Sequence, residues 1–209
     1  GAQRRSRVWP DLVGTRVRFR IGARMVAMSD HIESLRSQVR AIPVGSPPAP
    51  WTAMPPIAVG GLTHIGVATA VGAEYLLVIS HNGRGVFNEQ GVLVARDRGD
   101  EVGDWIDEVA LEATGIGPIE GQRVRLAGLT GGGLPTITAD GRSLDSLPVD
   151  WPQQRVVLQQ PGAGALWPGH EQGCVVVFTD YELRAHGFSP SGRLLILASS
   201  SDLCVFTRG

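Results

Sequence analysis

Residues 62–97 read LTHIGVATAVGAEYLLVISHNGRGVFNEQGVLVARD, and this stretch decides the fold. Its apolar runs alternate with the turn sequences VGAE, HNG and NEQG. The pattern predicts four short strands in meander order. HNG predicts a tight hairpin, because Asn and Gly both tolerate positive φ.

A shorter version of this stretch returns at the C-terminus, where residues 183–208 read LRAHGFSPSGRLLILASSSDLCVFTR. The two copies align without gaps between Leu76–Asn88 and Leu195–Thr207. Repeated strand and turn units predict a β-rich body built from similar sheets. The identical pairs are Leu76 with Leu195, Ser80 with Ser199, Val86 with Val205 and Phe87 with Phe206.

Each copy resembles one blade of a WD-repeat or PQQ-type β-propeller, and GFSPSGRLLILASSSDLCVF resembles it more closely than the first copy. With its GGLP run, the whole chain looks like bacterial β-repeat proteins to which no activity is assigned. The resemblance implies propeller-like sheets and no particular chemistry.

The remaining apolar runs complete an all-β, mainly antiparallel fold. QRVRLAGL, LPTITAD, RVVLQQ and CVVVF are further predicted strands, with SLDSLPVDW a weaker one, and DEVALEATGIG fits either a strand or a short helix. We expect about twelve strands in three four-stranded propeller-like sheets. Because closed propellers use four to eight blades, we expect a monomeric three-sheet body, with a ring-completing homodimer as the alternative.

Four segments are expected along the chain: a basic extension over 1–27, a helix over 28–42, a proline-rich linker or strap over 43–61, and one β-repeat domain over 62–209. Ser29 is the predicted N-cap, and Ile32, Leu35, Val39 and Ile42 follow on one face. In the extension, Val17, Phe19 and Ile21 alternate with arginines as in a strand. An alternative is that the natural product starts at Met25 or Met28.

Charge and composition exclude several kinds of chemistry. All 19 basic side chains are arginine, so Schiff-base, Walker and kinase-type lysine mechanisms are excluded. Residues 1–40 hold nine Arg against three acids, which leaves nucleic-acid binding as a weaker alternative. The two cysteines, Cys174 and Cys204, predict buried thiols, although one disulfide stays open. We expect no metal, no cofactor, no membrane association and a cytoplasmic location.

Two sets of residues are candidates for function. A hydrolase would use His81 as base, with Asp97, Asp100 or Asp104 to orient it, near the glycine loop Gly131, Gly132 and Gly133. A non-catalytic module that binds another protein or a ligand, of the immunity type for example, would present its loops and tryptophans. Its candidate binding residues are Arg84, Trp105, Trp151, Trp167 and the same three glycines. The binding module is our first hypothesis.

Overall fold

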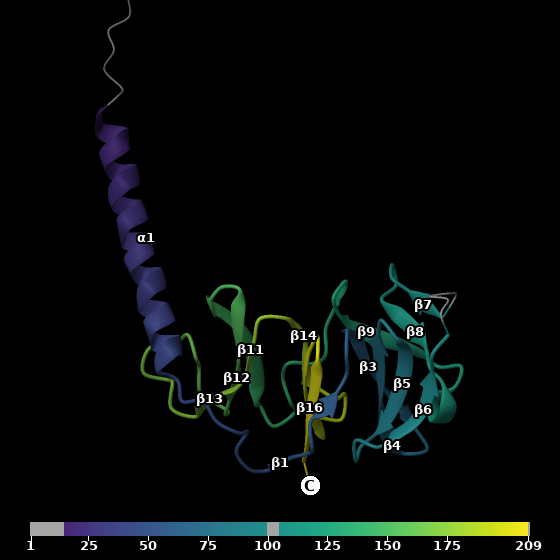
Figure 1. Ribbon diagram of the computed structural model, residues 1–209. Helices are drawn as coiled ribbons and strands as arrows, with labels where there is room; N and C mark the ends of the chain where they lie inside the picture. Colours follow the sequence, from purple (N-terminus) through teal and green to yellow (C-terminus); the bar gives the residue numbers. More distant parts are fainter. Residues whose placement is uncertain (1–14, 100–104, 209) are drawn as a thin grey trace, which may run out of the picture. The chain divides into compact units, whose positions relative to one another are not determined.

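The protein has an all-β body and one long helix (Figure 1). The structure is a computed structural model that describes residues 15–99 and 105–208, with side chains from Met28 onward. These residues form one α-helix, one short 3-10 helix and sixteen strands. The chain divides into two units between Ala41 and Ile42. The all-β prediction is confirmed.

The helix α1 (Thr15–Ala41) is 27 residues long and begins well before Ser29. The strand predicted from the alternation over 17–21 is therefore wrong, and Ser29 lies inside the helix rather than at its N-cap. An isolated strand leaves its backbone amides without partners, whereas a helix bonds them internally. The helix ends two residues before Pro43, as the sequence predicts.

The body contains three sheets, as predicted, but their sizes are eight, five and three strands. The eight-stranded sheet has the order β6-β5-β4-β3-β9-β8-β7, with β10 beside β9. The five-stranded sheet has the order β1-β16-β15-β14, with β2 beside β16, and the third sheet is β11-β12-β13. The strands of the first sheet are β3 (Leu62–Ala70), β4 (Ala73–Ser80), β5 (Gly83–Asn88), β6 (Leu93–Asp97), β7 (Ile106–Asp107), β8 (Glu112–Thr114), β9 (Arg123–Gly128) and β10 (Gly131–Gly132), with the 3-10 helix η1 (Gly117–Ile119) between β8 and β9. The others are β1 (Trp51–Ala53), β2 (Ile57–Ala58), β11 (Ser143–Asp150), β12 (Gln153–Gln159), β13 (Cys174–Asp180), β14 (Leu183–Phe188), β15 (Leu194–Ser199) and β16 (Asp202–Arg208).

The C-terminal sheet lies between the other two (Figure 1). On β15, Leu194, Ile196 and Ala198 pack with side chains of β3 and β4. Leu195 and Leu197 face the opposite way and pack with β11 and β12. All six residues of β15 are buried, because both faces of this sheet are covered.

The two copies of the repeat are equivalent hairpins, β4–β5 and β15–β16. Their shared serine has the same role in each turn. The Ser80 hydroxyl accepts the Asn82 amide at 3.2 Å, and the Ser199 hydroxyl accepts the Ser201 amide at 3.3 Å. Such turns stabilise a hairpin locally. The need for this turn explains why Ser80 and Ser199 are the same residue.

The proline-rich segment is a strap rather than a linker, since β1 and β2 both pair antiparallel with β16. A strand at the edge of a sheet tolerates prolines nearby, because the amide donors that prolines lack are not needed on its unpaired side. Trp51 is only 6% exposed and stacks on Phe188 with ring centroids 5.6 Å apart. Trp51 therefore anchors the strap on the body.

The prediction of a strand over 134–140 is wrong. This segment forms one isolated bridge, Ile137 to Ser143, followed by a turn. Thr138 organises the turn, because its amide donates to the Arg142 carbonyl at 2.9 Å and its carbonyl accepts the Gly141 amide at 2.9 Å. Hydrogen bonds within the turn therefore take the place of pairing with a neighbouring strand.

A buried carboxylate ties the first sheet to the C-terminal one. Glu74, at the start of β4, is only 2% exposed. Its two oxygens accept the Ser191 amide at 3.2 Å and the Ser191 hydroxyl at 2.8 Å, and Arg193 lies 3.9 Å away. Buried charges are retained where such partners satisfy them.

Three further features bear on function. No helix among residues 15–99 and 105–208 has the length and apolar character needed to cross a membrane. In the same residues, no group of three or more potential metal ligands occurs. Cys174 and Cys204 are both free thiols, and burial is the main cause that raises the pKa of each.

Candidate functional site

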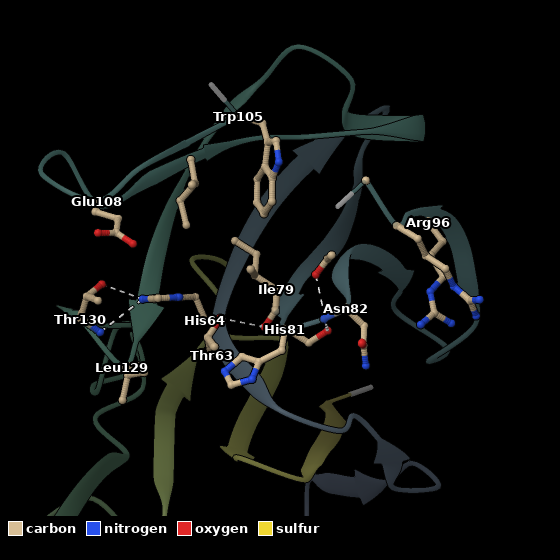
Figure 2. A pocket seen from close by; sticks show the side chains of 15 residues that line it. Thr63, His64, Ile79, His81, Asn82, Arg96, Trp105, Glu108, Leu129 and Thr130 are labelled. Atoms are coloured by element: carbon tan, nitrogen blue, oxygen red, sulfur yellow. Dashed lines mark hydrogen bonds between the residues drawn. The ribbon is translucent and has the colours of Figure 1, made fainter. Parts of the chain in front are cut away.

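A pocket of about 610 Å³ lies at one end of the eight-stranded sheet (Figure 2). Strand pairing brings its walls together: Leu62 pairs with Ser80, His64 with Gly128, and Arg84 with Asp97. The ends of β3, β4, β6 and β9 therefore meet there, with the start of β7 above them. The lining residues are Thr63, His64, Ile79, Ser80, His81, Asn82, Gly83, Arg96, Arg98, Gly99, Trp105, Ile106, Glu108, Leu129 and Thr130.

His64 is the buried polar group of this pocket, with 4% of its surface exposed. Its Nε2 lies 2.7 Å from the Thr130 hydroxyl and 3.3 Å from the Thr130 amide. Because the amide can only donate, Nε2 is the acceptor and the ring proton of the neutral form is on Nδ1. Nδ1 is buried and has no hydrogen-bond partner in the described residues.

The environment keeps this imidazole neutral. Burial lowers the pKa of His64 from its ordinary value of 6.5, and the negative charge of Glu108 opposes this only in part. The neighbouring Gly128 makes room for the ring, since a Cβ there would lie 2.8 Å from His64 Cδ2. Neither His64 nor Thr130 was among the residues predicted for function from the sequence.

His81 is exposed and lies in the turn between β4 and β5. Its ring packs against Gly61, where a Cβ would lie 3.2 Å from His81 Cγ, and its amide donates to the Gly61 carbonyl at 3.0 Å. The ring lines the pocket, but no hydrogen bond joins it to a carboxylate of the described residues.

Asp97 is bound to Arg84 instead. Its Oδ2 accepts Arg84 Nε at 3.1 Å and Nη2 at 3.0 Å, and its Oδ1 accepts the Gly99 amide at 3.0 Å. The Gly99 amide, followed by Arg84, lowers the pKa of Asp97. The predicted pairing of His81 with Asp97 does not form here, and Asp100 and Asp104 lie outside the described residues.

Arg84 also holds the aromatic wall of the pocket in place. Its Nη1 donates to the Thr114 carbonyl at 2.6 Å, and its Cζ lies 4.7 Å from the centre of the Trp105 ring. Such a cation–π contact fixes the ring. Of the predicted binding residues, the structure therefore brings Arg84 and Trp105 together, with Trp105 lining the pocket and Arg84 behind it.

The other predicted binding residues lie elsewhere. The glycine loop begins next to Thr130, but Gly131, Gly132 and Gly133 do not line the pocket. Gly131 and Gly132 form the short strand β10 at positive φ of 127° and 78°. A side chain on Gly132 would collide with the Leu126 carbonyl, so close packing explains this glycine.

Trp151 and Trp167 are exposed, at 77% and 62%. Trp151 lies in the turn between β11 and β12, whereas Trp167 lies in the loop that joins the other end of β12 to β13. The exposed tryptophans do not form one patch with Trp105, which belongs to the eight-stranded sheet region.

Comparison of the chain with family models, curated proteins and solved structures gives no match. The resemblance to propeller blades therefore stays a prediction, and the site is interpreted from its own geometry.

Proposed function

We propose that the protein is a non-catalytic ligand-binding module and that the pocket beside His64 is its binding site. One observation carries this proposal. The pocket wall holds Arg96, Arg98 and Glu108, whose side chains have no ion pair or hydrogen bond within the described part of the chain, around a cavity of about 610 Å³. Ligand sites are commonly concave, of this size, and lined by a few convergent polar groups on an apolar wall.

The binding interpretation is favoured over the hydrolase. A general base needs a carboxylate or a carbonyl to orient it and a nucleophile that can give up its proton. Asp97 is bound to Arg84 and the Gly99 amide, and Nδ1 of His64 has no orienting group among the described residues.

A small ligand is favoured over a protein partner because the exposed tryptophans lie apart. The two free thiols support a reducing, cytoplasmic setting.

The test uses uncharged aromatic fragments and the full chain. We expect them to shift the NMR signals of the Trp105 indole N–H and the His64 ring in the wild type. Leu129→Trp fills the mouth of the pocket, and Leu129 is 58% exposed, so folding should tolerate the change. This variant should weaken fragment binding about tenfold or more, because the fragment would lose its apolar contacts with the pocket wall.

Ile137→Trp is the matched control, because Ile137 is 67% exposed and does not line this pocket. It should bind the fragments as the wild type does. Fragments that shift signals only outside the pocket, or equal binding by Leu129→Trp and the wild type, would count against the proposal.

A further inference from the structure

The charged groups of the pocket are arranged as two opposite ends. Arg96 and Glu108 lie on opposite sides of it (Figure 2). Arg96 lies in β6 and Arg98 directly follows that strand, and both residues line the pocket. One end therefore carries two positive charges and the other a negative charge.

These charged side chains are unusual in having no ion pair or hydrogen bond with any residue that the structure describes. Of the arginines whose side chains the structure describes, only Arg96, Arg98 and Arg125 lack both an ion pair and a hydrogen bond with a described residue. Two of these three line the pocket. Glu108 likewise has no such partner. The other described arginines form ion pairs: Arg36, Arg40, Arg84, Arg123, Arg142, Arg155, Arg184, Arg193 and Arg208.

Apolar, aromatic and polar side chains line the rest of the pocket. Ile79, Ile106 and Leu129 line it together with Trp105, whose ring Arg84 holds. His64 adds no positive charge beside Glu108, because its buried imidazole stays neutral at neutral pH. The negative charge of Glu108 is therefore available to a ligand.

We propose that the ligand of this pocket is dipolar: an oxyacid group binds to Arg96 and Arg98, an ammonium or amino group binds to Glu108, and a flat apolar centre lies against Trp105. This inference rests on the proposed ligand-binding function and names the class of its ligand. Carboxylate and phosphate groups share the chemistry that arginine recognises, and both are included in the test.

The probes share one aromatic ring and differ in their end groups. They are 4-(2-aminoethyl)benzoate with both charges, 4-propylbenzoate with the acid only, 4-propylphenyl phosphate with a phosphate in place of the carboxylate, and 4-propylanisole with neither. Affinity is measured by NMR titration of the full chain. We expect the aminoethyl benzoate to bind several-fold more tightly than 4-propylbenzoate, and the anisole to bind most weakly. The ratio of the affinities for 4-propylphenyl phosphate and 4-propylbenzoate shows which oxyacid group the arginines prefer.

The variants assign each end of the ligand. Because these side chains are exposed, Arg96→Gln and Arg98→Gln should each weaken binding of the acid probes about threefold. Glu108→Gln should weaken binding of the aminoethyl benzoate by a similar factor and should not weaken that of 4-propylbenzoate. Arg125→Gln is the matched control for general electrostatic attraction and should bind every probe as the wild type does.

The outcomes separate this inference from the proposed function. If the anisole binds in the pocket but the charged probes bind no more tightly, the ligand is not dipolar and the binding function stands. An Arg125→Gln variant that loses as much affinity as Arg96→Gln would also overturn the assignment. If no probe, charged or neutral, binds in the pocket, both proposals fail.

Discussion

The free energy of unfolding should fall as the pH is lowered from about 7.5 to 5.5, and proton binding by His64 in the unfolded chain should cause part of that fall. In the unfolded chain its imidazole takes up a proton near pH 6.5, whereas burial lowers the pKa in the folded protein. The unfolded state therefore binds more protons than the folded state below pH 6.5. The stabilisation is fully present above pH 6.5 and is lost as the pH falls toward the folded pKa.

The size of the effect follows from proton linkage. One histidine that is neutral when folded and charged when unfolded contributes up to about 1.4 kcal/mol per pH unit. Burial also lowers the pKa of His186, so a second contribution of the same sign is expected. Together the two histidines can contribute at most about 2.7 kcal/mol per pH unit, over the pH range where both are charged in the unfolded chain and neutral in the folded protein.

The assay is urea unfolding at half-unit pH steps, in the wild type and in two glutamine variants. His64→Gln and His186→Gln should each reduce the slope of the free energy of unfolding against pH, because burial lowers the pKa of both histidines. A wild-type stability that is flat between pH 7.5 and 5.5, or a His64→Gln slope equal to that of the wild type, would refute the reasoning.

Three further predictions concern packing and reactivity. Gly66→Ala should lower the free energy of unfolding by about 2–3 kcal/mol, because a Cβ would lie 2.6 Å from atoms of the neighbouring strand β9; urea unfolding measures it. Glu74→Gln should destabilise the protein by about 1–3 kcal/mol, since it weakens the hydrogen bonds to Ser191 between two sheets, and a thermal midpoint unchanged from the wild type would contradict this. The thiols of Cys174 and Cys204 should react slowly with a disulfide reagent at pH 8 in the native protein and rapidly in denaturant, because burial raises their pKa.

The sequence predicts the hairpins better than the sheets. Four strands over 62–97 and the turn at HNG depend on neighbouring residues, and the structure has them. The equivalence of Ser80 and Ser199 was also visible, since the same local turn requires the same side chain. In contrast, the sequence predicts β9 only as a further strand, and the structure pairs it with β3 through Ile65 and Ala127. That pairing joins residues about sixty positions apart, and no local pattern marks it.

The candidate site was predicted only in part for the same reason. His81, Arg84 and Trp105 were singled out, and all three lie in or beside the pocket. His64 and Thr130 were not among the predicted candidates, because their contact depends on β3 lying beside β9. The assignment of Asp97 to His81 followed sequence proximity, whereas Arg84 faces Asp97 directly across the β5–β6 ladder.

By itself, the sequence determined the β class, the repeat and the absence of lysine chemistry, because composition and the period of apolar residues act over a few neighbouring positions. Only the tertiary structure shows which strands share a sheet, which histidine is buried, and which arginine side chains have no ion pair or hydrogen bond among the described residues. Each of these depends on pairs of residues far apart in the chain, and the free energy that selects such pairs comes from burial shared across the whole body.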